Sequence, residues 1–458
     1  MEPVNELMDK AMHRQRREPM VSWQEEYKGK YVSPEEAVRV IEPGDTVVIP
    51  VGTEVQALSR ALMNRRGELR DVTVLLRMPR YDLGWLSGDF AEAFNVILDT
   101  QPASLGAKAM NEKRVDLIPF LYGLRFKGEH DVRRKAQDVD VVMIVVSPPN
   151  KDGFCSFGLY LSHKKDYTSR AKKVLAEVSD TPPMRVRTPG DNYIHISDID
   201  YFVEHIPIPI QEPQQKHDQV DKKIADSVSA VVRDGDTLEL GPGLAASLPG
   251  LGSFDDRRDL GIHSPIIGPG LLDLLRRGIV TGKRKNLHPG KSISSGFRWI
   301  EKEEDIAFIN GNPTLEVRSS SYVNDIRVIA SNDRMVAING ILAIDLAGQI
   351  AADSIGSRMF GGAGGQVDFG IGSVLSKGGC SIAVLRSTAA KGTVSRIVPT
   401  FEPATIISLP WTFVDYVVTE YGIANLLGKS RRERAEELIA VAHPDFQAEL
   451  TTQVQKLL

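Results

Sequence analysis

The chain contains very little cysteine. Its 458 residues include only Cys155 and Cys380, which lie far apart and outside any CxxC pattern. Neither a disulfide framework nor a cysteine zinc site is therefore expected. No neighbouring cation or base stands ready to activate the Cys155 thiol, so we interpret it as an inert small residue. A low cysteine content is typical of proteins in the reducing cytoplasm, and we predict a cytoplasmic location.

Long apolar runs and a strong net charge are also missing. No stretch of about 18 uncharged apolar residues occurs, and the basic N-terminal segment has no apolar core behind it, so neither a membrane span nor a targeting signal is predicted. Lysine and arginine number 56 against 60 acidic residues, a formal net charge of -4. Such a balance attracts neither nucleic acid nor an anionic membrane. We expect a small molecule or another protein as the partner.

The histidines do not indicate a metal centre. His195, His263, His288 and His443 occur singly, with no HxH or HExxH spacing, and no metal is predicted. His263 directly precedes Ser264, but neighbours at the end of a strand point to opposite faces. We therefore do not interpret them as a hydrolytic base and nucleophile.

The chain does contain two similar α/β patterns. Residues 33–52 show a helical pattern, a Pro-Gly turn and an apolar β-branched strand, and residues 224–243 repeat this order. Elsewhere, continuous apolar strands such as 140–147 alternate with helical patterns such as 270–278. This alternation predicts an α/β fold with mostly parallel sheets that are covered on both faces.

A proline-rich, polar segment separates the two patterns. Residues 204–219 cannot form a long helix and are typical of an exposed crossover. We place the boundary near residue 212, which divides the chain into an N-terminal domain, 1–211, and a C-terminal domain, 212–458.

A glycine-rich loop is the strongest candidate for ligand binding. Residues 358–379 contain many glycines and few bulky side chains, so the backbone passes close to something there. Amide N–H groups in such a loop can cradle a phosphate-bearing or thioester ligand. A tightly turning loop without a ligand is the alternative, because neither a GxGxxG fingerprint nor a Walker-type pair is present. Residues 147–158, which follow a buried strand, are a candidate substrate wall.

Four acidic residues stand at strand ends or beside glycine. Glu239, Asp353, Asp368 and Glu420 share this setting. For each one, capping a helix or accepting hydrogen bonds from loop amides is the commoner role, and catalysis is the alternative.

Nine segments carry a family resemblance: SPPNKDGFCSFG, YIHISDIDYFVE, LGIHSPIIGPGLLDLLRRGIVTGKRKNLHPGK, YVNDIRVIASNDRMVAING, DLAGQIAADSIG, GGAGGQVDF, LSKGG, STAAKGTVSRIVP and YVVTEYGIANLLGK. Together they resemble the acetyl-CoA hydrolase/transferase family, which includes 4-hydroxybutyrate, butyryl and succinyl CoA-transferases. The resemblance begins at about Trp23 and continues to the C-terminus. It implies two CoA-transferase-type α/β domains, with the CoA site in the C-terminal one.

The resemblance also implies a chemical route. In the family a glutamate attacks the thioester, an acyl-glutamyl anhydride forms, and CoA thiolate converts it into a glutamyl-CoA thioester that passes CoA to a second carboxylic acid. Backbone N–H groups from the glycine-rich loop and from a G-x-G turn hold the oxyanion. Carried over onto this sequence, the coenzyme A site comprises Gly361, Gly362, Gly364, Gly365, Gln366, Asp368 and Lys377.

The chain departs from the family at the centre of this route. Pro265 occupies the position of the nucleophilic glutamate and supplies no carboxylate. The G-x-G turn reads Gly241-Pro242-Gly243, and proline has no N–H for an oxyanion. Glu239 stands where relatives usually carry glutamine, which makes it a weak candidate for a relocated carboxylate.

Three hypotheses follow from these departures. In the first, the chain keeps its acyl-CoA site but changes the reaction to hydrolysis, hydration or carbon-carbon cleavage. In the second, it is non-catalytic, either a CoA-thioester-binding regulator or one subunit of a heteromer whose paralogous subunit carries the glutamate. In the third, it is an ordinary CoA-transferase that exchanges CoA between an acyl-CoA and a small carboxylate. The resemblance implies an oligomer in each case.

Overall fold

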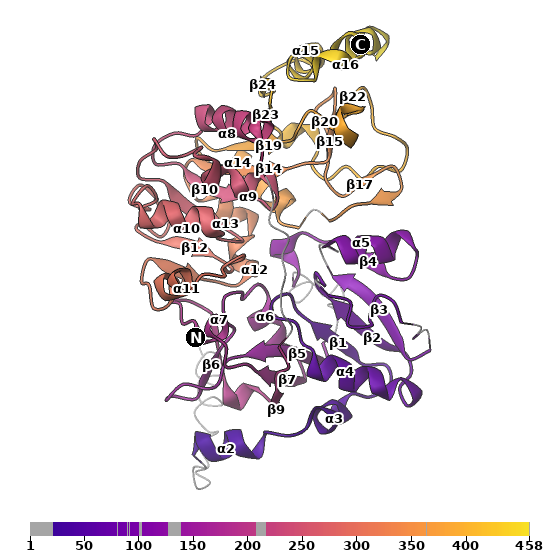
Figure 1. Ribbon diagram of the computed structural model, residues 1–458, viewed down its shortest axis with the longest axis vertical. Coiled ribbons are helices and arrows are strands. Elements are labelled where there is room, and N and C mark those ends of the chain that lie inside the picture. Colours follow the sequence, from indigo (N-terminus) through magenta and orange to yellow (C-terminus); the bar gives the residue numbers. More distant parts are fainter. Residues whose placement is uncertain are drawn as a thin grey trace, which may run out of the picture.

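The computed structural model describes residues 22–79, 81–88, 90, 92–99, 103–126, 139–207, 217–362 and 364–457. Within them the chain forms two halves, each built on one large sheet, and Figure 1 shows the first half below the second. The boundary predicted near residue 212 lies outside the described residues. In the part of the chain that is described, no helix combines the length and the apolar character needed to cross a membrane.

The first half contains a seven-stranded sheet in the order β4-β3-β2-β1-β5-β7-β9, and all neighbouring strands run parallel. Its strands are β1 (Thr46–Ile49), β2 (Val72–Leu76), β3 (Phe94–Asp99), β4 (Asp116–Ile118), β5 (Val141–Val146), β7 (Lys173–Val178) and β9 (Tyr201–Glu204). Its helices are α2 (Trp23–Gly29), α3 (Pro34–Ala37), α4 (Ala57–Asn64), α5 (Ala103–Asn111), α6 (Lys164–Thr168) and α7 (Pro182–Arg185). The short strands β6 (Phe154–Ser156) and β8 (Tyr193–His195) pair antiparallel.

The second half contains an eight-stranded sheet in the order β13-β12-β11-β10-β14-β19-β23-β24. All neighbours run parallel except β23 and β24. Its strands are β10 (Thr237–Leu240), β11 (Gly261–Ser264), β12 (Ser292–Ser294), β13 (Leu315–Val317), β14 (Met335–Gly340), β19 (Cys380–Val384), β23 (Tyr416–Thr419) and β24 (Gly422–Asn425). Its helices are α8 (Gln219–Val231), α9 (Leu244–Ser247), α10 (Pro269–Arg276), α11 (Glu303–Ile309), α12 (Ser320–Val323), α13 (Ile326–Ala330), α14 (Gln366–Leu375), α15 (Arg431–Ala440) and α16 (Pro444–Leu457).

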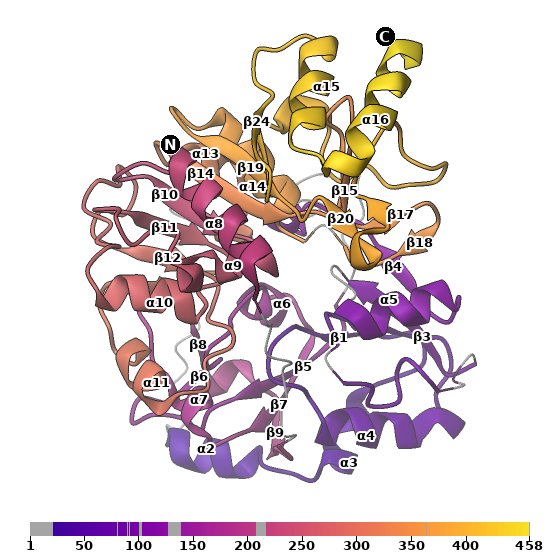
Figure 2. The ribbon, with the colours of Figure 1, turned by 45° about the horizontal axis from the view of Figure 1, so that its top comes forward.

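Smaller strands extend the second half beyond its main sheet, on the side marked β15, β17 and β20 in Figure 2. One small sheet joins β15 (Ala343–Asp345), β16 (Ile350–Ala351) and β22 (Ile397–Val398). Two hairpins pair β17 (Ser354–Ile355) with β18 (Arg358–Met359) and β20 (Thr388–Ala389) with β21 (Val394–Ser395). The glycine-rich loop leads from β18 into α14.

The strand pattern agrees with the mostly parallel α/β fold that the sequence predicts. All six residues of β5 are buried, and so are all four of β10. A strand that is buried on both faces reads as a continuous apolar run because neither of its faces meets water. In β10 that run is broken by one charged residue, Glu239.

The two halves are wound in the same order, which confirms two domains of similar build. From β1 the chain fills one side of its sheet through β2, β3 and β4 and then the other through β5, β7 and β9. From β10 it fills one side through β11, β12 and β13 and then the other through β14, β19 and β23. The repeated segments of the sequence therefore lead into corresponding strands. Open α/β sheets bind ligands at the carboxyl ends of such central strands.

Candidate active site

A cavity of about 330 Å³ lies at the carboxyl ends of β10, β11 and β14, between the two halves. The residues that the sequence analysis singled out and that line this cavity are Glu239, Pro242, Pro265, Gly361, Gly362, Gly364, Gly365 and Gln366. Gly241 of the predicted G-x-G turn lines it as well. The lining residues that the sequence did not indicate are Met78, Tyr122, Tyr160, Leu240, Ile266, Arg298, Asn324, Asn339, Gly340 and Ala352. The cavity therefore brings together segments that are up to about three hundred residues apart.

Glu239 is the only carboxylate among the described residues that line this cavity. Its side chain belongs to the fully buried strand β10 and is 2% exposed. One carboxylate oxygen, Oε2, accepts a hydrogen bond of 2.8 Å from Nδ2 of Asn339 on the neighbouring strand β14. Burial raises the pKa of Glu239 to about 8, because the charged form loses its hydration. A carboxyl group with such a pKa can take up or release a proton near neutral pH.

Pro265 lies beside the glycine-rich loop. A Cβ atom added at Gly365 would be 3.6 Å from Cγ of Pro265 and 2.5 Å from Nδ2 of Asn324. The approach to Asn324 is too close for a side chain at position 365, whereas the distance to Pro265 is an ordinary contact, and the φ of Gly365, -86°, is also ordinary. The position to which the resemblance assigns the nucleophile therefore lies next to the loop, and proline offers no reactive group there.

Asn324 is a buried amide that faces this contact. Its Nδ2 and Oδ1 atoms form no hydrogen bond of ordinary geometry with any described residue, although the residue is fully buried. Its amide nevertheless lies near enough to the Asp368 carboxylate to lower the pKa of that group. Buried polar atoms nearly always find a partner, so the Oδ1 atom in the wall of the cavity is a candidate contact for a ligand. Asn324 precedes Asp325, the N-cap of α13, and lies in the segment YVNDIRVIASNDRMVAING, one of those that carry the family resemblance.

The glycine-rich loop ends at the start of α14. No side chain of the described residues caps this helix at Gly365. Gly364 has a φ of +49°, a conformation that suits glycine. The first N–H groups of a helix have no partner within the helix and carry the positive end of its dipole. Because Gly365 and Gln366 line the cavity, this end is positioned to stabilise negative charge there.

The turn after β10 offers less to an oxyanion. The N–H group of Gly241 already donates to the carbonyl oxygen of Ile338, at 2.8 Å, and Pro242 has no N–H. In the glycine-rich loop, the N–H of Gly361 donates to the carbonyl oxygen of Asp353 at 3.2 Å. The start of α14 and the Arg298 guanidinium, which also lines the cavity, are therefore its two positively charged parts.

Two further residues of the predicted coenzyme A site lie outside the cavity. Asp368 is fully buried, and its carboxylate accepts hydrogen bonds from the backbone N–H groups of Tyr122, at 3.1 Å, and Gly123, at 3.4 Å. Burial raises the pKa of Asp368 to about 7, although these amides oppose the shift. Lys377 is exposed beyond the far end of α14, about 15 Å along the helix from Gln366.

The remaining candidates have structural partners. His263 and Ser264 form separate hydrogen bonds, to the carbonyl oxygens of Val323 and Ile266, and burial lowers the pKa of His263 to about 3. The carboxylate of Asp353 accepts a hydrogen bond from Ser408, and that of Glu420 accepts hydrogen bonds from Ser387. Burial raises the pKa of the Cys155 thiol to about 12, so the thiol is protonated at neutral pH. Among the described residues no cluster of three or more histidine, cysteine or acidic side chains is suited to a metal.

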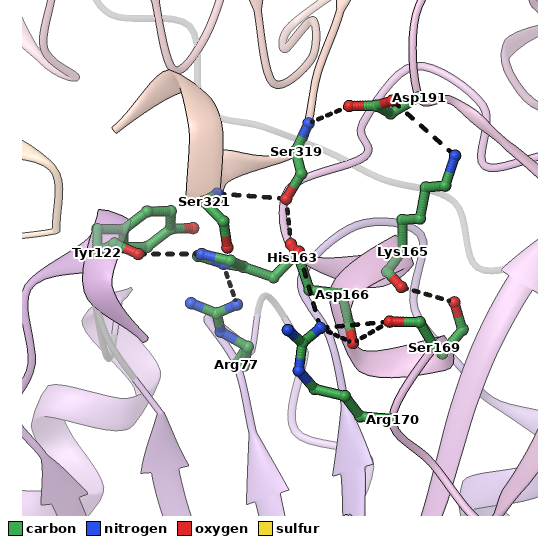
Figure 3. A network of polar contacts seen from close by, with 11 residues as sticks. Arg77, Tyr122, His163, Lys165, Asp166, Ser169, Arg170, Asp191, Ser319 and Ser321 are labelled. Carbon is green, nitrogen blue, oxygen red and sulfur yellow. Dashed lines mark hydrogen bonds and ion pairs between the residues drawn. The ribbon is translucent and has the colours of Figure 1, made fainter. Parts of the chain in front are cut away.

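A buried polar network connects the first half to this cavity, as Figure 3 shows. Arg77 donates to Nδ1 of His163 at 2.7 Å, and Nε2 of His163 donates to the carbonyl oxygen of Tyr122 at 3.0 Å. Burial lowers the pKa of His163 well below its usual range, and the charge of Arg77 adds to the effect, so the imidazole is neutral. In the same network Ser319 of the second half donates to Asp166 of α6. The network holds Tyr122 in the cavity wall.

Two family models match the chain. Residues 8–212 match the acetyl-CoA hydrolase/transferase N-terminal domain, and residues 303–454 match the acetyl-CoA hydrolase/transferase C-terminal domain. The chain is 37% identical over 443 residues to a 4-hydroxybutyrate coenzyme A transferase of Clostridium kluyveri, covering 95% of this chain and 100% of that protein. It is 34% identical over 447 residues to a succinyl-CoA:cyclohexane-1-carboxylate CoA transferase of Geobacter metallireducens, covering 95% and 97% of the two chains.

Solved structures agree with these matches. RipA from Yersinia pestis is similar with a TM-score of 0.85 and 31% identity, over 95% of this chain and 99% of that one. A 4-hydroxybutyrate CoA-transferase from Porphyromonas gingivalis is similar with a TM-score of 0.73 and 33% identity, over 95% and 100% of the chains. The chain therefore belongs to the acetyl-CoA hydrolase/transferase family, whose members act on acyl-CoA thioesters.

Proposed function

We propose that this chain binds an acyl-CoA with its thioester in the 330 Å³ cavity and hydrolyses it, with Glu239 as the general base. The observation that carries the proposal is that Glu239 is the only carboxylate among the described residues lining a cavity that also contains Pro265 and the start of α14. A reaction that needs a carboxylate here has Glu239 to use and nothing at position 265.

The proposed reaction is the hydrolysis of the thioester by one water molecule. Glu239 takes a proton from a water molecule while the water oxygen attacks the thioester carbon. The oxyanion that forms is stabilised by the start of α14 and by the amide of Asn324. The C–S bond then breaks, and Glu239 returns the proton to the CoA thiolate, so the products are a carboxylic acid and CoA. A carboxyl group with a pKa of about 8 is a stronger base than an ordinary one and exchanges its proton near neutral pH, as this role requires.

A neighbouring cavity supports a path for the CoA moiety. It has a volume of about 430 Å³ and shares Pro242, Gly340 and Ala352 with the first cavity. Arg386 and Arg396 also line it. Guanidinium groups are well suited to phosphate, so we propose that the phosphates of CoA lie here while the pantetheine arm passes the shared residues.

Both guanidinium groups are held in place by neighbouring groups. Arg386 forms ion pairs with Asp218 at 3.0 Å and Asp221 at 2.8 Å, both close to the start of α8. Arg396 donates to the carbonyl oxygens of Ile341 and Leu342. Such fixed geometry lowers the ordering cost when a phosphate binds.

The test compares the wild-type chain with Glu239→Gln. Glutamine keeps an oxygen for Asn339 and is the residue that similar proteins usually carry, so the variant should fold. Acyl-CoA affinity, measured by calorimetric titration, should change little. Hydrolysis should fall about 10²- to 10⁴-fold, the usual contribution of a general base. Absence of acyl-CoA binding by the wild type contradicts the proposal. Binding without turnover supports a regulator or a subunit whose paralogous partner carries the glutamate.

A second candidate is CoA transfer to a carboxylic acid, with Glu239 as the nucleophile. The observation in its favour is the 37% identity to a CoA-transferase over nearly the whole chain. The two candidates differ in their intermediate. Borohydride reduction during turnover, followed by peptide mass spectrometry, detects a glutamyl-CoA thioester at position 239 only if transfer occurs.

A further inference from the structure

A third cavity extends the proposed thioester site into the first half. It has a volume of about 480 Å³ and lies beyond the carboxyl ends of β1 and β2. Met78, Tyr160 and Arg298 line both this cavity and the one that contains Glu239. An acyl group attached to a thioester in the first cavity therefore has direct access to it.

The wall of this cavity is apolar and is built by both halves. Val51 and Met184 from the first half are 5% and 2% exposed, and Phe297 and Ile300 from the second are 3% and 7% exposed. Among the described lining residues, the only carboxylates belong to Glu301 and Glu303, and both residues are exposed. Arg298 is the one cation of the described lining, and it lines both cavities, so the rest of the wall is apolar apart from Thr53 and the hydroxyl of Tyr160. A largely apolar wall of this kind is typical of a site for a hydrophobic group.

Two residues of the wall have unusual backbone conformations. Met78 has a φ of +48° and Trp299 a φ of +60°, a region that side-chain-bearing residues rarely adopt. Such conformations persist only where the surrounding structure holds them, and they gather at ligand sites. Arg298 lies over the Trp299 ring at 4.8 Å and so helps to hold this part of the wall.

We infer that the acyl group of the substrate is an uncharged, ring-sized hydrocarbon group rather than an acetyl group. This inference rests on the proposed function. A two-carbon acyl group fills only a small part of 480 Å³, so most of the apolar wall would gain no contact. A cyclohexyl or phenyl ring removes that wall and its own carbons from water, and affinity rises with the apolar area buried.

The experiment measures the affinity of the whole chain for CoA, acetyl-CoA, cyclohexanoyl-CoA and benzoyl-CoA by calorimetric titration. Five added carbons, each worth roughly a four-fold gain when buried, predict that a ring-bearing thioester binds at least about 100-fold more tightly than acetyl-CoA. Equal affinities for acetyl-CoA and both ring-bearing thioesters overturn the inference and leave the proposed function standing. No binding of any of the four overturns the proposed function as well.

A cavity-filling variant makes the test specific to this wall. Ile306 of α11 is half-buried and lines the cavity, so Ile306→Trp places an indole in the space of the acyl group. The variant should lose at least about ten-fold in affinity for benzoyl-CoA and keep its affinity for acetyl-CoA. Ile439→Trp is the control, because Ile439 is equally half-buried on α15 and lines neither cavity. An equal loss in the two variants overturns the inference.

Discussion

At the scale of single residues, the proposed function assigns the reactive carboxylate to Glu239 and not to position 265. Pro265 stands in contact with the glycine-rich loop but has no carboxylate, and Glu239 brings one into the same cavity from a strand that is otherwise apolar. A buried carboxyl group costs stability when it ionises. Its presence without a cationic partner in β10 therefore argues for a role in chemistry.

Pro265→Glu should restore the usual route of the family. It places a carboxylate beside Gly365, where the thioester is expected, so CoA exchange between acetyl-CoA and butyrate should appear or rise by at least about ten-fold. Borohydride during turnover should then trap a CoA thioester at position 265. Ile266→Glu is the matched control, since it adds a carboxylate to the neighbouring residue of the same cavity wall. Equal exchange rates in both variants would contradict the prediction.

Glu239→Gln should also change how stability depends on pH. The carboxyl ionises near its ordinary pKa of 4.5 in the unfolded chain but only near 8 in the folded one, so the unfolded state binds fewer protons between these values. Stability of the wild type therefore falls as the pH rises from about 4.5 to about 8. The melting temperature of the variant should exceed that of the wild type by a margin that grows over this range.

The same series contains its own control. Asp368, whose pKa is about 7, contributes a similar slope to both proteins and cancels in the difference. A melting-temperature difference that stays constant from pH 5 to pH 8.5 would show that Glu239 is not neutral in the folded protein.

At the scale of elements, two features meet at Gly365 in the loop before α14. The backbone passes close to the Asn324 side chain, and no side chain of the described residues caps the start of the helix. Gly365→Ala should disturb both, because its Cβ atom would lie 2.5 Å from Nδ2 of Asn324. Since the φ of Gly365 is ordinary, the effect comes from contact and not from backbone strain. We expect acyl-CoA affinity to fall about ten-fold or more, measured by titration.

Gly361→Ala is the matched change in the same loop. Its Cβ atom would come no closer than 3.9 Å to the nearest heavy atom, the carbonyl oxygen of Ala352. Affinity should therefore stay close to that of the wild type. Equal losses in the two variants would mean that the loop responds to any side chain, and the close approach at Gly365 would not explain the effect.

At the scale of the whole molecule, the cavity exists only where the halves meet. The turn at Tyr122–Leu124 of the first half packs against α12 and α14 of the second, and Asp368 of α14 accepts its N–H groups. A Cβ atom added at Gly123 would lie 2.2 Å from the carbonyl oxygen of Asn324. The contact between the halves therefore also positions a wall of the active site.

Gly123→Ala should separate these elements, because the clashing atoms belong to the backbone and cannot rotate away. We expect a loss of about 1–3 kcal/mol in the free energy of unfolding, as for other overpacked contacts, together with weaker acyl-CoA binding. Thermal melts and titrations measure the two effects. Gly67→Ala is the control, since no heavy atom lies within 4 Å of its Cβ position and its stability should change by less than about 0.5 kcal/mol.

Much of the fold could be predicted from the sequence because it depends on short-range patterns. The apolar run at 140–147 forms the buried strand β5. The repeated helix, turn and strand patterns at 33–52 and 224–243 contain the corresponding strands β1 and β10. The first predicted helix is shorter than expected: α3 has four residues and continues as a single 3-10 turn, Val38–Val40. The family motifs also predict that the glycine-rich loop binds the ligand and that Pro265 lies beside the reacting group.

The rest was decided by tertiary structure. Asn324 and Asn339 lie in a segment that carries the family resemblance, but no pattern indicated a role for either amide or for Arg298, because such a group becomes informative only when its surroundings are known. The apolar cavity combines ends of β1 and β2 with residues 297–306, and no sequence pattern joins segments so far apart. The sequence by itself determined the two α/β halves and placed a proline at position 265, where the resemblance predicts the nucleophile. The structure alone decided that Glu239 faces the same cavity as Pro265, because that depends on the pairing of β10 with β11 and β14 in one sheet.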